Sequence, residues 1–211
     1  MSVLDFIGDI VKEGKNVCIA SCGRSGSHAL FYHIRDNYDV YPSSPSEPLL
    51  PPPRWTSQDE KEYLAQVRVK KRILFICQAL QLEEEQCLQT RKTLFDDCRT
   101  IKVVRNFYDI CSSLAIAETD DMWDRQSWEN GVRPVDFYLD RLNEKFCHAL
   151  FDNTLKRKKI LDKLRADVVI SYEDLPNKQI EKNEFIDSSV HERIREYYDK
   201  WRKNTDEKKL R

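Results

Sequence analysis

The segment Asn16–Ile34 constrains the fold of this chain more than any other stretch of the sequence. It reads NVCIASCGRSGSHALFYHI, in which an apolar, β-prone run at 17–20 leads into small residues at 21–27 and then into a helix-like run. Gly23 and Gly26 allow the backbone of the turn to approach a ligand closely. A buried strand, a tight turn and a helix in this order bring backbone N–H groups and the positive helix end together. The segment therefore predicts an anion site.

The turn of this segment supplies further donors for an anion. Arg24 carries a planar fork of N–H groups that suits the oxygens of a phosphate or sulfate group. The backbone amides of 25–27 and the Ser27 hydroxyl add donors closer to the backbone than the Arg24 guanidinium. His28 follows directly in the chain. The candidate binding residues are consecutive in the chain: Gly23, Arg24, Ser25, Gly26, Ser27 and His28.

Length, composition and charge narrow the classes of protein to consider. With 211 residues, of which 40% are hydrophobic and 34% charged, the chain has the profile of a soluble globular protein, and we expect one domain over 1–211. The net charge of −1 provides no global field for binding nucleic acid. No apolar run approaches the ~20 residues of a membrane span. An odd number of scattered cysteines, without a secretory signal, favours reduced thiols, no metal site and a cytoplasmic protein.

Strand-like and helix-like stretches alternate along the chain. Short apolar or β-branched runs at 72–79, 100–104 and 167–171 predict three strands after the first. This alternation favours an α/β fold, a three-layer sandwich with a mainly parallel central sheet. Ligands bind at the carboxyl ends of parallel strands. We therefore expect the turn at 21–28, the segment 105–113 and Tyr172 to meet at one edge of the sheet.

The remaining stretches are predicted to be helices or loops. A helical stripe of apolar residues at 138–150 follows Pro134, which suits a first helical position. Ser189–Glu192 has the pattern of a capping box and predicts the start of a C-terminal helix. Further helical patterns cover 57–70, 82–96, 109–117 and 155–165, and loops are expected at the proline-rich stretch 38–56 and the acidic stretch 118–134.

Three short motifs resemble the marks of one enzyme family. They are the loop CGRSGSH, the segment VVRNFYDICSS and the segment ISYEDL. Together they resemble the sulfotransferases that use 3′-phosphoadenosine-5′-phosphosulfate (PAPS). The family marks are a strand–loop–helix, an R-N-P-x-D pattern with a serine eight residues after the arginine, and Y-E-D-L after a late strand. Phe107 stands where the family has proline. The resemblance spans roughly residues 16–176 and implies a P-loop-like sulfotransferase fold.

The resemblance implies a role for each motif. It places the 5′-phosphate and the sulfuryl group at 23–28, the 3′-phosphate at Arg105 and Ser113, and the adenine at Tyr172. It implies PAPS as cofactor, 3′-phosphoadenosine 5′-phosphate (PAP) as product, no metal, and in-line transfer to a hydroxyl or amine. The physical chemistry of sulfuryl transfer agrees, because fixed donors stabilise the charge that develops on the leaving phosphate and the equatorial oxygens.

An acceptor hydroxyl needs a general base within hydrogen-bond reach. Glu47 is the first candidate, because the stretch around it resembles a segment in which some branches of the family place the catalytic Glu. His28 and His33 are the second candidates, and Arg24 is expected to stabilise the transferred group. The acceptor is expected to be a small molecule or a glycan, with 38–56 and 118–134 as insertions on its side of the site.

Two other functions remain open from the sequence. The pattern C-x5-R-S at 18–25 resembles the phosphate loop of low-molecular-weight cysteine phosphatases, in which Cys18 would be the nucleophile and Arg24 the phosphate clamp. Ser21 stands where that loop usually has glycine, and this interpretation gives Arg105 no role. The other alternative is a non-catalytic module that binds PAP or PAPS and has lost its base.

Overall fold

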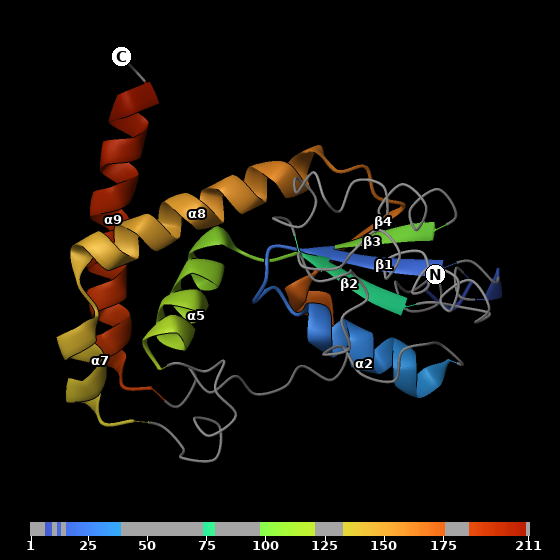
Figure 1. The fold of residues 1–211 in the computed structure, drawn as a ribbon, viewed down its shortest axis with the longest axis horizontal. Helices are drawn as coiled ribbons and strands as arrows, with labels where there is room; N and C mark the ends of the chain where they lie inside the picture. The colour runs from blue at the N-terminus through green and yellow to red at the C-terminus, as the bar shows by residue number, and fades with distance from the viewer. Residues whose placement is uncertain are drawn as a thin grey trace, which may run out of the picture. The chain divides into compact units, whose positions relative to one another are not determined.

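The fold is taken from a computed structural model, which describes residues 7–9, 12–13, 16–38, 74–78, 98–120, 133–175 and 186–209. The chain divides into two compact units. We name them the sheet unit, Met1–Arg105 with Arg157–Lys178, and the helical unit, Asn106–Lys156 with Gln179–Arg211. Each unit is described separately below, and Figure 1 labels the elements of both.

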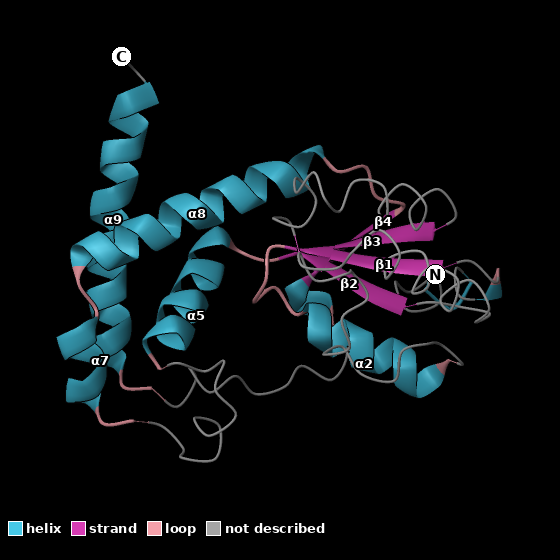
Figure 2. Ribbon diagram, viewed as in Figure 1, coloured by secondary structure: helices cyan, strands magenta, loops and turns pink. Residues whose placement is uncertain are grey.

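The sheet unit contains a four-stranded parallel sheet in the order β2-β1-β3-β4. Figure 2 shows these strands side by side. Their bounds are β1 Asn16–Ser21, β2 Leu74–Gln78, β3 Cys98–Val104 and β4 Val168–Ser171. The α/β class with a parallel sheet is thus confirmed, as are the four predicted strands. Because β2 and β3 flank β1 on opposite sides, the end of β1 is a point where the strand order reverses, and ligands bind at such points in open α/β sheets.

Helix α2 (Ser27–Asn37) packs on one face of this sheet, as Figure 1 shows below the strands. Side chains alternate between the two faces of a strand, so Val17 and Ile19 of β1 point to the same face. Both are buried in one core with three residues of α2, namely Leu30, Phe31 and Ile34. Burying side chains of this size stabilises the fold by about 1.5–3 kcal/mol each. This packing fixes the start of α2 next to the end of β1.

An ion-pair network joins the start of β4 to β3. Asp167 Oδ2 accepts a hydrogen bond of 2.8 Å from the Thr100 amide, and Asp167 Oδ1 accepts one of 2.9 Å from Arg99. Arg99 also contacts Glu13 at 3.0 Å. Burial alone would raise the pKa of Asp167, but the bonds from Thr100 and Arg99 outweigh it and hold that pKa below its ordinary value. The network holds β4 in register, and so places the residues that follow it.

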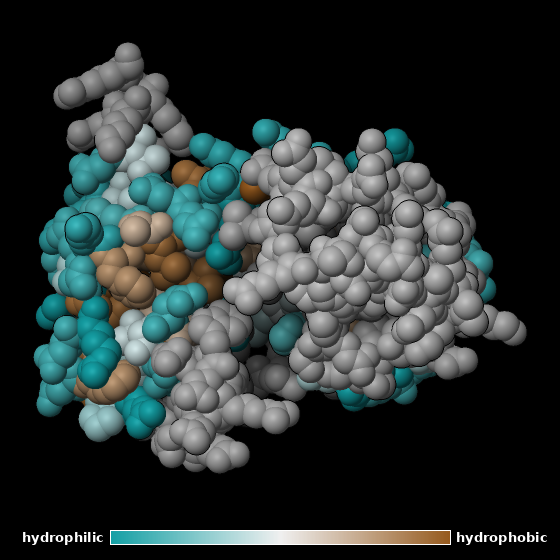
Figure 3. All heavy atoms as spheres, in the orientation of Figure 1, coloured by the Kyte–Doolittle hydropathy of each residue, from teal (hydrophilic) through white to brown (hydrophobic). Residues whose placement is uncertain are grey.

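The helical unit is formed by four described helices, and Figure 3 shows apolar side chains reaching its surface where α5, α8 and α9 come together. Their bounds are α5 Phe107–Thr119, α7 Val135–Arg141, α8 Glu144–Lys163 and α9 Ser188–Lys209, the residues of α8 from 157 on belonging to the sheet unit. Their shared core includes Cys111, Tyr138, Phe151, Ile194 and Trp201. The Trp201 ring is also fixed by a hydrogen bond of 2.8 Å from its Nε1 to Asp152.

Two helix boundaries differ from the sequence prediction. The stripe at 138–150 belongs to two helices, because the chain leaves α7 at Leu142, and Asn143 Oδ1 then accepts the Phe146 amide at 3.0 Å as the cap of α8. The predicted capping box at Ser189 is also wrong. Helix α9 begins at Ser188, and Asp187 is the capping residue, accepting hydrogen bonds from both the amide and the hydroxyl of Ser189.

The structure tests other helix predictions in part. The helix expected at 109–117 is confirmed and is longer at both ends, so that α5 includes two residues of the predicted loop 118–134. The proline-rich stretch 39–56 and the helices predicted at 57–70 and 82–96 lie outside the described residues. Within the described ranges, no helix combines the length and the apolar character that a membrane span requires.

Candidate functional site

The turn between β1 and α2 has an unusual backbone. Three of its residues have positive φ, with values of 76° at Gly23, 49° at Arg24 and 90° at Gly26. Glycine adopts this left-handed region readily, whereas a residue with a side chain loses about 1–2 kcal/mol there. Successive N–H groups in such turns line a concave surface that binds anions. We name residues Gly23–Ser27 the anion loop.

The start of α2 faces the same turn. Gly26 is the N-cap of this helix, and within the described ranges no side chain caps its first amides. Exposed amides and the helix dipole make such an end favourable for an anion. The Gly23 amide is engaged in the turn itself, since it donates to Ser21 Oγ at 3.4 Å. The backbone at this position therefore has the geometry that an anion site requires, and anion binding here stays a prediction.

The serines of the anion loop lie inside it. Ser25 is fully buried, and its Oγ has no hydrogen-bond partner among the residues that the structure describes. Ser27, the first residue of α2, is 7% exposed. Leaving a buried hydroxyl unsatisfied costs about 1–3 kcal/mol. The loop therefore retains hydrogen-bonding capacity that the oxygens of a bound anion can satisfy.

Arg105 connects the end of β3 to the anion loop. Its Nη1 donates a hydrogen bond of 3.0 Å to the carbonyl oxygen of Arg24. Its guanidinium carbon also lies 4.0 Å from the centre of the Tyr172 ring, a cation–π contact. Residues that follow β1, β3 and β4 thus meet at the carboxyl edge of the sheet, as the motif order predicted. Sequence reasoning gave Arg105 a ligand-binding role and missed its bond to the loop backbone.

Tyr172 and Leu175 close the other end of the anion loop. A Cβ atom at Gly26 would lie 2.6 Å from Tyr172 Cδ2 and 2.4 Å from Leu175 Cδ1, so the site requires glycine. Leu175 is buried in the core of the sheet unit. The sequence analysis gave Leu175 no role, although it ends the quoted motif. Its apolar side chain after three polar or amphipathic residues was the available signal.

His28 lies in the first turn of α2, next to the anion loop. The residue as a whole is exposed, while partial removal from water lowers the pKa of the imidazole below its ordinary value of 6.5. The nearby Arg24 guanidinium lowers this pKa further. His28 is therefore neutral at pH 7, the form in which an imidazole can accept a proton.

For two predicted site residues the structure leaves the prediction untested. Ser113 lies in α5 of the helical unit and is 1% exposed, so its part in a 3′-phosphate site stays a prediction. Glu47, the first candidate for the general base, lies outside the described residues.

The cysteines near the loop do not have the setting of nucleophiles. Cys18 is fully buried within β1, opposite Phe75 of β2 and Thr100 of β3, and the strand continues to Ser21. A phosphatase nucleophile has to face the bound phosphate, so this position does not favour the phosphatase alternative. Burial raises the pKa of Cys22 to about 11, which keeps that thiol neutral. In the described part of the chain, no cluster of three or more His, Cys, Asp or Glu could hold a metal ion.

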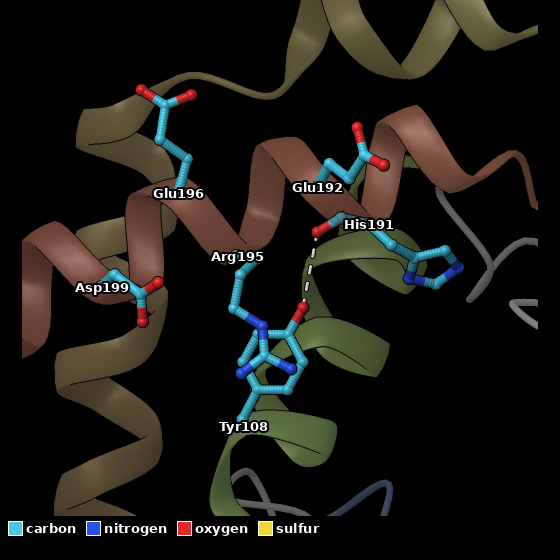
Figure 4. Close-up of a pocket in the computed structure, with 6 residues that line it drawn as sticks. All are labelled: Tyr108, His191, Glu192, Arg195, Glu196 and Asp199. Carbon is cyan, nitrogen blue, oxygen red and sulfur yellow. Dashed lines mark hydrogen bonds between the residues drawn. The ribbon is translucent and has the colours of Figure 1, made fainter.

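A separate groove of about 400 Å³ lies between α5 and α9 of the helical unit. Figure 4 shows Arg195 lying over the ring of Tyr108, and its guanidinium carbon is 3.5 Å from the ring centre. The Tyr108 hydroxyl donates to the His191 carbonyl at 3.4 Å. Three carboxylates complete the lining, those of Glu192, Glu196 and Asp199. Glu196 pairs with Lys200 at 2.9 Å.

Comparisons with known proteins assign no family to the chain. No protein-family model matches the sequence, and no curated protein matches it. Among solved structures, it is similar to a crystal structure of retinol dehydratase in complex with androsterone and inactive cofactor PAP. The identity is 13%, over 88% of this chain and 80% of that chain, with a TM-score of 0.27. A likeness at this level establishes neither family nor function, so the function is argued from the residues of this chain.

Proposed function

We propose that this chain is a sulfotransferase that binds PAPS at the anion loop and transfers its sulfuryl group to a hydroxyl or amine acceptor. The observation that carries this proposal is the assembly of Arg24, Arg105 and Tyr172 around one left-handed turn. Arg105 bonds to the Arg24 carbonyl at 3.0 Å and lies 4.0 Å from the Tyr172 ring. These residues come from the three motifs that resemble the sulfotransferase marks.

The residues present fit an anionic nucleotide. The anion loop combines a left-handed backbone at Gly23 and Gly26, the unsatisfied hydroxyl of Ser25 and the start of α2. These groups would hold the 5′-phosphate and the sulfuryl group. Tyr172 offers an aromatic ring for the adenine. Arg105, with Ser113 as its predicted partner, would hold the 3′-phosphate.

The chemistry asked of these residues is mainly electrostatic. PAPS, when bound, supplies an activated sulfuryl group on a phosphate leaving group. The Arg24 guanidinium carries a positive charge that stabilises negative charge at the loop. The loop amides do the same without reorganising, because the backbone holds them in place. His28, neutral at pH 7, can accept a proton from an acceptor hydroxyl, and Glu47 is the other candidate for that role.

Thermal unfolding with PAP tests the binding half of this proposal. A ligand that binds only the folded state at ~100 times its Kd stabilises the protein by about 2.7 kcal/mol. We expect PAP to raise the melting temperature of the chain, and AMP, ATP and inorganic phosphate to raise it less at equal concentration. A shift with ATP or phosphate but none with PAP would contradict the proposal.

Transfer of labelled sulfate tests the catalytic half. PAPS labelled in its sulfuryl group is incubated with the chain and with phenol, sugar, amine and steroid acceptors, and the label is followed into product. We expect transfer to at least one class of acceptor. The matched variant Arg24→Ala should be inactive. Binding of PAP without transfer to any acceptor would favour the non-catalytic module instead.

A further inference from the structure

We propose that Arg105 is a positioning residue that holds the anion loop in its binding conformation, beyond any contact it makes with a 3′-phosphate. This inference rests on the proposed function in one respect, which is that the loop binds an anion. It concerns the bond from Arg105 Nη1 to the Arg24 carbonyl, 3.0 Å long, rather than a bond to a ligand.

The bond acts on the residue of the loop whose backbone conformation is the least favourable. Arg24 has a φ of 49°, in the left-handed region that favours glycine, and it has a side chain. A residue in such a conformation persists only where surrounding contacts hold it. Arg105 supplies one such contact, directly to the carbonyl group of Arg24.

Holding this carbonyl also orients a donor for the anion. The peptide group between Arg24 and Ser25 is planar and trans, so its C=O and its N–H point in opposite directions. Because Arg105 fixes the direction of the carbonyl, it also fixes the direction of the Ser25 amide. Loss of the Arg105 bond would therefore misdirect the Ser25 amide. This would weaken the binding of any anion in the loop, including that of a ligand that has no 3′-phosphate.

Contacts at both ends of the loop make this arrangement rigid. The Arg105 guanidinium packs against the Tyr172 ring at 4.0 Å, and Tyr172 packs against Gly26 so closely that a Cβ there would be 2.6 Å from its Cδ2. Arg105 thus contacts Arg24 near the start of the loop, and Tyr172 contacts Gly26 near its end. The contact between Arg105 and Tyr172 connects the two. A guanidinium has five N–H donors, so the bond to Arg24 is compatible with a phosphate contact.

Two ligands that differ only in the 3′-phosphate separate the two roles of Arg105. We would measure the Kd of PAP and of AMP by calorimetry for the wild type, Arg105→Gln and Arg105→Lys. Loss of a charge-assisted hydrogen bond corresponds to about a tenfold or larger loss of affinity. A positioning role predicts such a loss for both PAP and AMP in Arg105→Gln. A role in 3′-phosphate binding alone predicts a loss for PAP and an unchanged Kd for AMP, which would overturn the inference.

Arg195→Gln is the matched control. It removes the same kind of arginine–tyrosine contact, at 3.5 Å from Tyr108, from the surface of the helical unit. We expect it to leave the Kd of both nucleotides unchanged. Arg105→Lys keeps the charge and can donate one hydrogen bond, but it lacks the planar group that lies over Tyr172. We expect its affinities to lie between those of the wild type and Arg105→Gln.

Amide hydrogen exchange gives a readout that needs no ligand. In Arg105→Gln we expect faster exchange at the amides of 24–27 and unchanged exchange in β1 and β3, which also shows that the sheet is folded. Unchanged exchange at 24–27 would overturn the inference, whatever the nucleotide affinities are. If the wild type binds neither PAP nor AMP, the proposed function fails, while the exchange data still decide whether Arg105 holds the loop. If Arg105→Gln does not fold, Arg105→Lys is read by the same exchange measurement.

Discussion

The two units of this protein each contain an arginine that lies over a tyrosine ring, and the two pairs differ in what else they touch. Arg105 lies 4.0 Å from the Tyr172 ring in the sheet unit, and Arg195 lies 3.5 Å from the Tyr108 ring in the helical unit. The distance alone would rank the second pair as the stronger. Both contacts are of a type that contributes about 0.5–1 kcal/mol at an exposed site.

The difference lies in the backbone that each pair touches. Arg105 bonds to the carbonyl of a residue with positive φ, and Tyr172 packs against a glycine with positive φ. Arg195 and Tyr108 lie on regular helices, and the backbone group that the Tyr108 hydroxyl contacts, the His191 carbonyl, also lies within a helix. A contact of modest energy becomes functionally important when it holds a backbone conformation that the chain does not adopt unaided. The predictions below test this distinction, beginning with the largest effect.

Gly26→Ala should have the largest effect. The new Cβ would meet Leu175 Cδ1 at 2.4 Å and Tyr172 Cδ2 at 2.6 Å, in a residue whose φ is 90°. Overpacking costs about 1–3 kcal/mol and the left-handed conformation about 1–2 kcal/mol. We expect the free energy of unfolding to fall by about 2–5 kcal/mol and PAP binding to be lost. Urea unfolding and calorimetry measure these two quantities.

Gly8→Ala is the control for this variant. Its Cβ would also make a close contact, at 2.7 Å, but with the hydroxyl at the end of the Tyr38 side chain, which can move aside. We expect a loss of stability well below that of Gly26→Ala, and unchanged PAP binding. Equal losses in the two variants would mean that crowding alone, and not the geometry of the anion loop, determines the effect.

Arg24→Gly should separate the stability of the loop from its function. Glycine adopts the φ of 49° without strain and keeps the carbonyl that Arg105 contacts. We expect the free energy of unfolding to stay the same or to rise by up to about 1 kcal/mol. Loss of the guanidinium should weaken PAP binding by about 10–100-fold. A variant that is less stable than the wild type would show that the Arg24 side chain supports the fold as well.

Trp201→Phe should affect the helical unit alone. It removes the hydrogen bond of 2.8 Å from Trp201 Nε1 to Asp152 and leaves a smaller ring in the core. We expect a loss of about 1–2 kcal/mol in the free energy of unfolding, measured by urea titration. PAP affinity, measured by calorimetry under native conditions, should not change. A changed affinity would show that the packing of the helical unit contributes to the nucleotide site.

His28→Gln should have the smallest effect on stability, visible only in its dependence on pH. The folded-state pKa of His28 lies below its ordinary value of 6.5, so the unfolded chain binds protons first as the pH falls. The stability that depends on neutral His28 is therefore present above pH 6.5 and is lost as the pH falls through the folded-state pKa. We expect the wild type to lose more stability than His28→Gln between pH 7.5 and pH 5, measured by urea unfolding. Parallel curves would mean that the folded and unfolded pKa values of His28 are equal.

The sequence by itself determined the class of the fold, and it predicted the elements of the candidate site. Apolar runs gave the strands, and alternation with helical patterns gave a parallel sheet whose carboxyl edge collects the ends of β1, β3 and β4. The small residues between Ser21 and Ser27 indicated an anion site at one of these ends. These features are local or periodic, and for this reason a single sequence is sufficient to predict them.

The sequence was less reliable where two local choices compete. Apolar spacing continues unbroken through 138–150, yet Asn143 caps a new helix there because its side chain bonds to the Phe146 amide. Asp187 competes in the same way with Ser189 as the cap of α9. A side chain that can bond to the backbone has more than one partner within reach, and the packing of the helices decides between them.

Only the tertiary structure decided how the anion loop is held. Arginine, unlike glycine, does not signal a positive φ. The sequence therefore does not indicate that Arg24 has a φ of 49° or that Arg105 contacts its carbonyl. The sequence also gave no reason to pair Gly26 with Leu175. These contacts join residues that are distant along the chain and close only once the sheet has formed. The local sequence therefore identifies the donors of the candidate site, whereas their orientation depends on strand order and packing.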